Sequence, residues 1–202
     1  MAFVGLMYAL FAPIEKELAY QPVQYKSGAA VVVGKMIGAD VTFNRDSNSL
    51  YADDAESESD NSITGGTVTL NLDDVSEEAE VVILGTVKAT DTVNEKQVDV
   101  YQEVGDASPY GGFGYVRVRR KNGVNSYQAN GIHKTQLGIS SENAATKGQS
   151  ITWQTPSLTG PIMAVKNNAD KKNHFRKKAR FATAEEAIAW INKLGGYTEA
   201  AS

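Results

Sequence analysis

Alternating apolar and polar residues run through much of the chain and predict β-strands. The segment TVTLNL (67–72) has the period of two that belongs to a strand with one buried face. The segments TVKATDTV (86–93) and QVDVYQEV (97–104) alternate in the same way and predict two strands joined by a turn near Asn94 and Glu95. Frequent glycine, valine and threonine also favour strands and turns, so we expect a mainly β fold.

The clearest local prediction is a β-hairpin that turns at Asn122-Gly123. This dipeptide accommodates the positive φ angles of a two-residue hairpin turn. Closing the chain there pairs apolar residues on one face: Val118 with Tyr127, and Val116 with Ala129. The basic residues of the first strand then project from the other face: Arg117, Arg119 and Lys121.

Two short helices are predicted from their capping residues. The sequence has two capping-box patterns, Asp74 with Glu77 and Thr183 with Glu186. Gly85 ends the first predicted helix and Gly195-Gly196 end the second. The second helix has an apolar stripe made of Ala187, Ile188, Ile191 and Leu194. We therefore expect a short flanking helix and a C-terminal helix beside the strands.

The N-terminal residues 1–27 are predicted to be an extended arm, because Pro13 and Pro22 interrupt any helix. Their apolar run is too short to span a bilayer, and no basic region or clean cleavage pattern marks a signal peptide. We expect a soluble chain that is not exported and does not contact a membrane. A β domain is expected over 1–166, followed by a basic linker and helix over 167–202 that belong to it or form a small appendage.

A ladder of carboxylates follows a predicted turn at residues 46–48. The acidic residues recur at every second position and are Asp54, Glu56, Glu58 and Asp60. We expect a β-hairpin over 38–58 whose second arm carries this acidic ladder, with all four carboxylates on one face. Two interpretations explain such a face. It is either a surface exposed to solvent or part of a water-filled passage that many copies of the chain line. A weak divalent-cation site is a third reading, although the spacing is not that of an EF-hand.

Charge is unevenly distributed along the 202 residues. Residues 1–110 hold 6 Lys and Arg against 19 Asp and Glu, a net charge of −13, whereas residues 111–202 hold 14 against 5, a net charge of +9. The total of −4 therefore conceals an acidic first part and a basic second part. The two parts are neutralised within one fold or between copies that meet acidic side to basic side.

The basic part includes a dense run between residues 171 and 180. Its cations are Lys171, Lys172, Arg176, Lys177, Lys178 and Arg180. A solvated linker before the last helix is one interpretation, and docking onto an acidic neighbouring subunit is another. Together with the basic residues of the predicted hairpin, these cations are our candidates for contacts between subunits or rings. Nucleic-acid binding is a third interpretation, in a chain whose pI is about 5.3.

The sequence contains no pattern that indicates an enzyme. Cysteine is absent, and the two histidines, His133 and His174, stand outside any recognisable motif. Neighbouring carboxylates, as in Asp73-Asp74, point to opposite faces of a strand. The glycine-rich segment 111–114 lacks the Gly-Lys-Ser/Thr of a phosphate-binding loop and precedes a hairpin instead of a helix. We predict no catalytic residue, no cofactor and no metal site.

Two segments resemble the major tail proteins of long-tailed, siphophage-type bacteriophages. The first, from Leu50 to Gly85, joins the acidic ladder to a glycine pair, an alternating strand and a short helix. The second, from Gly112 to Gly160, is a hairpin followed by a TKG-S-I-x-WQTP-like strand between Thr146 and Pro156. The order and spacing of the two segments carry the resemblance, which does not extend to residues 167–194.

The resemblance implies a structural virion protein with a β-sandwich or small barrel. Such proteins assemble into hexameric rings that stack into the hollow tail tube through which double-stranded DNA passes. The expected partners are further copies of the chain, a tape-measure protein and other tail proteins. The expected location is the virion tail, assembled in the cytoplasm of the bacterial host. A tube of a phage-tail-like bacteriocin belongs to the same class.

The lumen of such a tube is typically acidic, which makes the acidic ladder our candidate for its wall. A wall of carboxylates repels phosphates, whereas a basic wall releases counterions and binds DNA. The alternative from another class is a soluble nucleic-acid-binding module. It would use the basic hairpin and the run at 171–180.

Overall fold

The computed structural model describes residues 2–52, 55–105, 107–141, 155–166 and 170–197, with the backbone alone for residues 48–52 and 55–60. The described residues are mainly β with two helices, which confirms the predicted fold class. Within this part of the chain the sheets do not close into a barrel.

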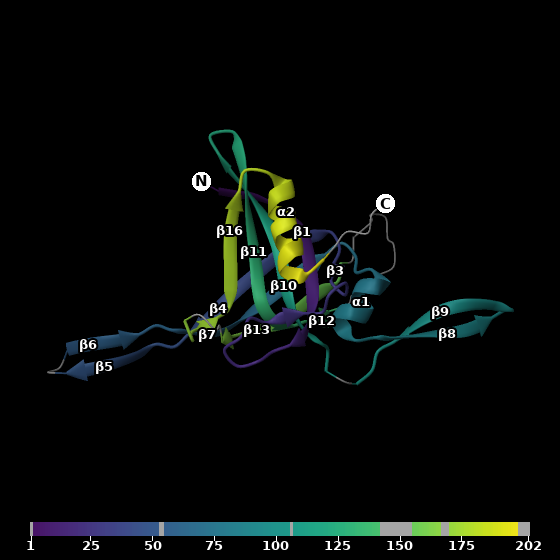
Figure 1. The fold of residues 1–202 in the computed structure, drawn as a ribbon, viewed down its shortest axis with the longest axis horizontal. Helices are drawn as coiled ribbons and strands as arrows, with labels where there is room; N and C mark the ends of the chain where they lie inside the picture. Colours follow the sequence, from purple (N-terminus) through teal and green to yellow (C-terminus); the bar gives the residue numbers. More distant parts are fainter. Residues whose placement is uncertain (1, 53–54, 106, 142–154, 167–169, 198–202) are drawn as a thin grey trace, which may run out of the picture.

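The largest sheet has ten strands. They are β1 (Ala2–Lys16), β2 (Gln24–Tyr25), β3 (Val31–Val32), β4 (Met36–Arg45), β7 (Ile63–Leu72), β10 (Tyr110–Lys121), β11 (Val124–Gln136), β12 (Gly138–Ser141), β13 (Ser157–Met163) and β16 (Arg176–Phe181). Their order is β2-β1-β10-β11-β13-β7-β4, with β3 beside β1, β12 beside β13 and β16 beside β11. Strands β10, β11 and β16 stand upright above a base that contains β4, β7 and β13 (Figure 1).

Three smaller sheets have two strands each. They are β5 (Asn48–Ala52) with β6 (Ala55–Asp60), β8 (Val87–Val93) with β9 (Lys96–Gln102), and β14 (Val165–Lys166) with β15 (Asn173–His174). Hairpins β5–β6 and β8–β9 project from opposite ends of the base (Figure 1). We refer to them as the β5–β6 arm and the β8–β9 arm.

Two predicted hairpins are confirmed in detail. Strands β10 and β11 turn at Asn122 and Gly123, whose φ angles are 51° and 80°. The predicted cross-strand neighbours are those observed, Val116 with Ala129 and Val118 with Tyr127. Strands β8 and β9 turn at Asn94 and Glu95, which also have positive φ angles. Both turns have the left-handed backbone that two-residue hairpins require.

The hairpin that carries the acidic ladder is longer than predicted. Strand β4 pairs with β7, and β5 continues the hairpin by pairing with β6. The turn predicted at residues 46–48 is therefore wrong, because the chain passes there from β4 into β5 without reversing. The backbone bond from Asp46 to the carbonyl of Ser62 joins the two strands at this point. The prediction of an acidic second arm is correct, since Glu56, Glu58 and Asp60 lie in β6.

The N-terminal residues form no separate arm, which corrects the prediction for 1–27. Strand β1 pairs with β10 along its length, with β2 and β3 on its other side. Ala9 and Phe11 face one hydrophobic core, and Leu10 and Ala12 face the other. A strand buried on both faces has an uninterrupted apolar run in place of alternation, which explains why the sequence pattern was misread.

Pro161 lies in the interior of the sheet. It occupies β13, which is hydrogen-bonded to β7 on one side and to β11 and β12 on the other. The Pro161 carbonyl accepts a hydrogen bond of 2.8 Å from the Thr135 hydroxyl. The predicted strand at Ile151 and Trp153 lies outside the described residues.

The C-terminal basic segment is built into the main sheet, so the interpretation of 171–180 as a solvated linker is wrong. Strand β16 pairs with β11 over six residues. Helix α2 (Ala184–Gly195) follows and packs on the sheet through Ala187 and Ile191. Its predicted capping box between Thr183 and Glu186 is confirmed.

Helix α1 (Glu77–Leu84) is present and ends at Gly85 as predicted, but its cap differs. The N-cap is Ser76, whose hydroxyl accepts a hydrogen bond from the Ala79 amide. Asp74 Oδ1 instead accepts a hydrogen bond from the Val75 amide, after the end of β7 at Leu72. Aspartate and serine are both favourable N-cap residues, and the backbone conformation before the helix places Ser76 at the cap.

Two hydrophobic cores lie on opposite faces of β1 and β10. One is covered by α2 and includes Val116, Ala129 and Ile191. The other lies between β4, β7, β13 and α1 and includes Phe113 and Leu158. The sheet is thus a shared layer between two cores.

Candidate interaction surfaces

Strand β16 places three predicted cations on one face of the upright sheet. Arg176, Lys178 and Arg180 are each separated by one residue, so they project from the same side of the strand. Gln128 of β11 lies opposite Arg180 on one side and opposite Arg117 on the other. The fold therefore places the basic hairpin and the basic run, which are far apart in sequence, in one row.

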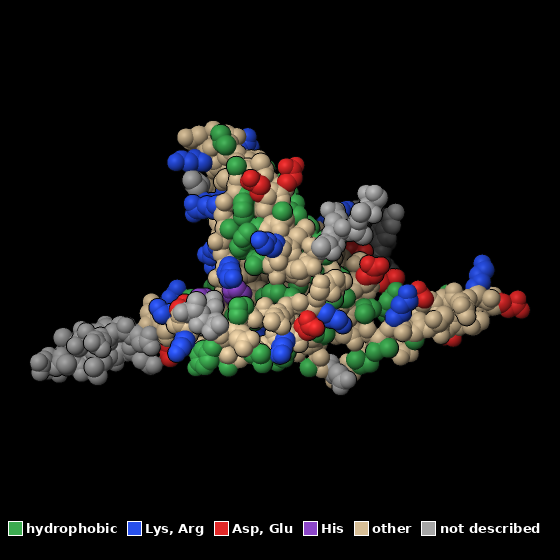
Figure 2. Space-filling view, in the orientation of Figure 1, with side chains coloured by type: hydrophobic (Ala, Val, Ile, Leu, Met, Phe, Trp, Pro, Cys, Tyr) green, Lys and Arg blue, Asp and Glu red, His purple; other side chains and the backbone are tan. Residues whose placement is uncertain are grey.

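We name this surface the basic face. It consists of Arg117, Arg119, Arg176, Lys178 and Arg180, and a hollow of about 400 Å³ lies between its strands. Figure 2 shows lysine and arginine side chains gathered along the edge of the upright part. No salt bridge in the described part of the chain involves Arg117, Lys178 or Arg180. The positive charges of Arg117, Lys178 and Arg180 thus have no carboxylate counterpart among the described residues.

Aromatic rings hold the guanidinium groups of the basic face. The Cζ atom of Arg117 lies 3.4 Å from the centroid of the Phe3 ring, and Cζ of Arg119 lies 5.2 Å from it. Cζ of Arg176 lies 4.7 Å from the centroid of Phe43. Such cation–π contacts hold the arginine side chains in fixed orientations over the rings.

Like charges crowd Lys178. Partial burial and the positive charges of Arg176 and Arg117 lower the pKa of its ammonium group. An anionic partner at this position would relieve the repulsion, so the surface is electrostatically suited to carboxylates or phosphates.

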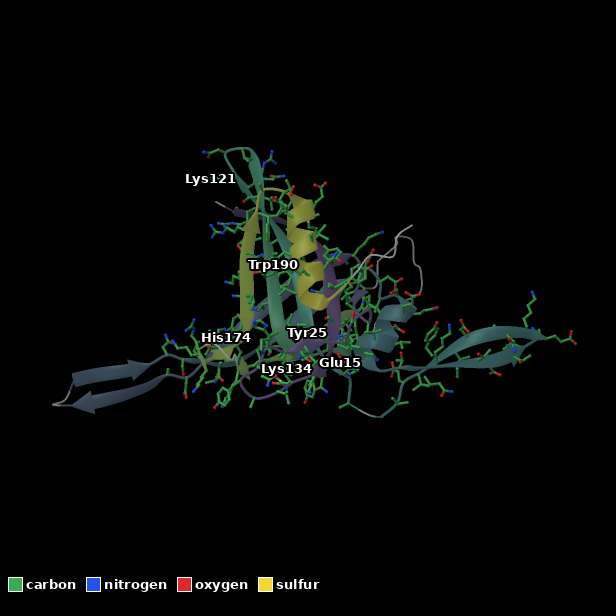
Figure 3. The ribbon with its side chains drawn as sticks, in the orientation of Figure 1. Glu15, Tyr25, Lys121, Lys134, His174 and Trp190 are labelled. Carbon is green, nitrogen blue, oxygen red and sulfur yellow. The ribbon has the colours of Figure 1, made fainter. Side chains whose placement is uncertain are left out.

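The remaining predicted cations lie elsewhere. Lys121 is at the tip of the β10–β11 hairpin (Figure 3), and Lys171 and Lys172 lie between β14 and β15. Lys177 projects from the opposite face of β16 and lines a different pocket. The structure therefore places only some of the predicted contact residues on the basic face. It also adds Phe3, which the sequence did not indicate because its stacking on arginine is a tertiary contact.

The acidic ladder lies on the β5–β6 arm. Asp54 is outside the described residues, whereas Glu56, Glu58 and Asp60 belong to β6. The register between β5 and β6 shifts by one residue between the partners of Glu56 and Glu58. The assignment of this ladder to a lumen wall stays a prediction, as does a cation site on it.

The β8–β9 arm is a surface that the sequence did not indicate as functional. Most of its side chains are exposed, including Val87, Val93 and Val98. A salt bridge of 2.7 Å between Lys88 Nζ and Asp99 Oδ2 links its two strands. An isolated two-stranded hairpin is marginally stable in water. Exposed valines on such an arm are therefore expected where another surface packs against it.

A pocket of about 360 Å³ lies beside the lower end of β16. Its lining includes Tyr25, His133, His174, Lys177, Trp190 and Lys193. Figure 3 shows Tyr25 and His174 where the upright part meets the base, and Trp190 higher, on α2. His174 Nε2 lies 2.9 Å from Asp170 Oδ1, as expected of a surface residue, while His133 Nε2 is buried without a hydrogen-bond partner in the described part of the chain.

Folding stability is expected to depend on the protonation of His133. Burial, with smaller effects from Lys177 and His174, lowers the pKa of this imidazole to about 4, whereas its unfolded pKa is 6.5. The contribution of neutral His133 to the free energy of unfolding is fully present above pH 6.5 and is lost as the pH drops towards 4. In this range only the unfolded state takes up the proton, which lowers the free energy of unfolding by up to about 3 kcal/mol. NMR titration should show one imidazole changing near pH 4. A His133 imidazole that titrates near pH 6.5 would contradict this expectation.

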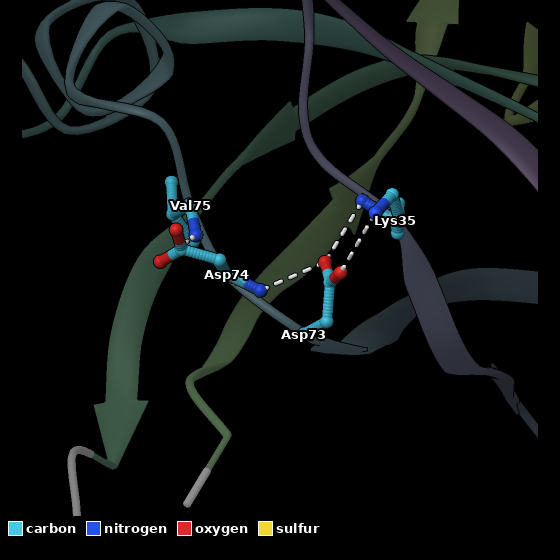
Figure 4. Close-up of polar contacts among 4 residues, drawn as sticks. All are labelled: Lys35, Asp73, Asp74 and Val75. Atoms are coloured by element: carbon cyan, nitrogen blue, oxygen red, sulfur yellow. Dashed lines mark hydrogen bonds and ion pairs between the residues drawn. The ribbon is translucent and has the colours of Figure 1, made fainter.

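The neighbouring carboxylates Asp73 and Asp74 have structural roles. Asp73 Oδ1 accepts hydrogen bonds from the Lys35 amide at 3.1 Å and the Asp74 amide at 2.8 Å, and Asp74 Oδ1 accepts from the Val75 amide at 2.9 Å (Figure 4). These bonds fix the junction between β7 and α1. No group of three or more potential metal ligands occurs among the described residues.

The glycine-rich segment 111–114 lies within strand β10 and does not form a loop. A Cβ atom at Gly111 would meet the Phe11 ring, one at Gly112 the Tyr25 ring, and one at Gly114 the side chain of Ile191. These glycines allow close packing of rings and α2 on the strand. Their position in a strand gives them no helix N-terminus with which to bind phosphate.

No protein-family model matches the chain, and no curated protein matches it significantly. Among the described residues, no helix is both long and apolar enough to cross a membrane.

Proposed function

We propose that this chain is a non-enzymatic structural subunit that assembles into stacked rings forming a hollow tube. The observation that carries the proposal is the pair of projecting β-hairpin arms. Within the described residues, each arm pairs only with itself, and the β8–β9 arm exposes several valines. Contact with neighbouring copies would cover the arms and stabilise them.

The charge distribution supports assembly between identical copies. By sequence, an acidic segment lies in strand β6 of one arm. The basic face lies on the upright sheet (Figure 2). Two complementary but different surfaces on one chain give head-to-tail contacts, which produce closed rings or open filaments. Open strand edges offer the hydrogen-bonding groups for such contacts.

The resemblance to siphophage major tail proteins supplies the finer part of the proposal. On this basis the rings are hexameric, the tube conducts DNA in the virion tail, and its partners are a tape-measure protein and other tail proteins. The mainly β fold with a short flanking helix is compatible with that role.

A second candidate function is nucleic-acid binding. It is favoured by the basic face, where Arg117 and Arg180 lie in one row beside the exposed ring of Phe3. Cations contact phosphates, and an aromatic ring stacks on bases in single-stranded nucleic acid. This function predicts DNA retention that weakens steeply with salt.

Electron microscopy of the purified protein, alone and with a tape-measure protein, tests the tube directly. We expect rings or tubes with a central hole, because arms and basic faces meet between copies. Protein that stays monomeric at high concentration and at all salt concentrations would contradict the proposal. A mobility-shift titration with DNA at low salt should show no binding, whereas strong salt-sensitive binding would favour the second candidate.

A further inference from the structure

The pocket beside the lower end of β16 has a positively charged lining. Three lysines from different elements meet around it: Lys166 of β14, Lys177 of β16 and Lys193 of α2. The two histidines of the chain, His133 and His174, line it as well. No aspartate or glutamate of the described residues belongs to this lining. The pocket therefore attracts negative charge.

These lysines have no carboxylate partner in the described part of the chain, where the salt bridges join other residues. Asp170 is the carboxylate bonded to the pocket lining, and its Oδ1 atom lies 2.9 Å from His174 Nε2. The same oxygen accepts a hydrogen bond of 3.0 Å from the Lys172 amide. The charge of Asp170 is thus directed to His174 and the backbone, and it leaves the three lysine charges unpaired.

The imidazole of His133 responds to the same positive charges. Burial contributes most to the lowering of its pKa, and the nearby charges of Lys177 and His174 lower that pKa further. An anion in the pocket would offset these two charges. Electrostatics at this position therefore favours a ligand that carries negative charge.

Hydrogen bonds between elements fix the walls of the pocket. The Tyr25 hydroxyl donates a hydrogen bond of 2.9 Å to the His133 carbonyl, which joins β2 to β11. The His133 amide donates to the Phe175 carbonyl at 3.1 Å. Trp190 of α2 and Val165 of β14 add apolar side chains to the lining (Figure 3). A pocket with walls fixed in this way loses little freedom when a ligand binds.

The size of the pocket indicates the size of the ligand. Its volume of about 360 Å³ falls within the range of about 300–1,000 Å³ that is typical of small-molecule sites. A phosphate group alone would occupy only a small part of this volume. The remaining space has aromatic and apolar walls, which suit the organic part of a ligand.

We propose that this pocket binds a small organic phosphate, with its phosphate group at Lys177 and Lys193 and its organic part against Trp190 and Tyr25. Lysine commonly binds phosphate, and a dianion compensates several lysines better than a single carboxylate does. A small molecule is favoured over a segment of another chain because the lysines surround a concave pocket and not a flat face. The inference goes beyond the proposed assembly and does not depend on it.

NMR of protein with isotope-labelled histidine tests this site, because both imidazoles line the pocket. Phenyl phosphate, inorganic phosphate and phenol are titrated separately at neutral pH. The pocket variant is K177Q/K193Q. The matched control is K178Q/R180Q, which removes the same amount of positive charge from the other face of β16. Circular dichroism shows whether the variants are folded.

We expect phenyl phosphate to shift both imidazole signals to saturation, whereas phenol, which has no charge, leaves them unchanged. Inorganic phosphate should bind more weakly, because it makes no contact with the Trp190 ring. The K177Q/K193Q variant should bind phenyl phosphate at least about tenfold more weakly than wild type, and the control within about twofold of wild type.

Other results would overturn the inference. If neither imidazole signal shifts to saturation with phenyl phosphate, the pocket does not bind an organic phosphate. An equal loss of binding in K178Q/R180Q would show that net charge, and not this pocket, holds the anion. Signals that shift when the protein assembles without added phosphate would assign the pocket to a carboxylate of a neighbouring copy. Protein that binds phenyl phosphate but never forms rings would overturn the proposed function alone.

Discussion

Replacing Gly160 by alanine is expected to destabilise the protein by about 3 kcal/mol or more. A Cβ atom at this position would lie 2.1 Å from the Gln136 carbonyl oxygen and 2.8 Å from its carbonyl carbon. Both are backbone atoms, which cannot move aside as the end of a side chain can. Overpacking of a tight interior commonly costs about 1–3 kcal/mol, and a backbone clash lies at the upper end or beyond.

The position of Gly160 in the sheet makes this clash difficult to relieve. Strand β13 is held between β7 and the strands β11 and β12. Any shift of β13 would disturb Leu158 and Ile162, which are both buried in the larger core. The expected loss is a large part of the 5–15 kcal/mol that typically separates folded from unfolded domains.

Urea denaturation followed by circular dichroism measures this loss. Gly138→Ala is the matched control, because a Cβ there meets no atom within 4 Å and its φ is not in the left-handed region. We expect the control to change stability by less than about 0.5 kcal/mol. Equal midpoints for the two variants would contradict the observed proximity of β13 to Gln136.

Replacing Ile191 by alanine is expected to cost about 2–5 kcal/mol. Its side chain is 1% exposed and packs α2 against the sheet. The Ile191 methyl group occupies the space above Gly114, where a Cβ would approach it to 2.6 Å. Truncation removes buried apolar surface and leaves a cavity above Gly114, which has no side chain to fill it.

The same denaturation experiment shows whether α2 is part of the cooperative core. Ile37→Ala is the control, since Ile37 is 59% exposed and the same atoms are removed there. We expect a single transition that shifts to lower urea in the Ile191 variant only. If the sheet of the Ile191 variant unfolds at the same urea concentration as in wild type, the helix is an independent appendage.

The local structure of this protein was readable from its sequence. The turn at Asn122-Gly123, the register of β10 with β11 and the capping box at Thr183 were all predicted as they occur. In each case the deciding interactions join residues close together in the chain. Turn geometry and capping hydrogen bonds leave direct marks in such short segments.

The candidate site was only partly predictable for the same reason. The cations of β10 and of residues 171–180 were identified from the sequence, but Phe3 and the row that joins Arg117 to Arg180 were not. The row depends on both β10 and β16 pairing with β11. Pairing between strands distant in sequence is set by packing, and no short segment records it.

The sequence by itself determined that the chain is mainly β, where its tight hairpins turn, where α2 begins and ends, and that its charge is divided into acidic and basic parts. Only the tertiary structure decided that β1 lies between two cores, that the basic run is the edge strand β16, and that Pro161 sits inside the sheet. The physical reason is the range of the interactions. Alternation, turns and caps act between near neighbours, whereas burial on two faces and an open strand edge depend on which distant segments meet.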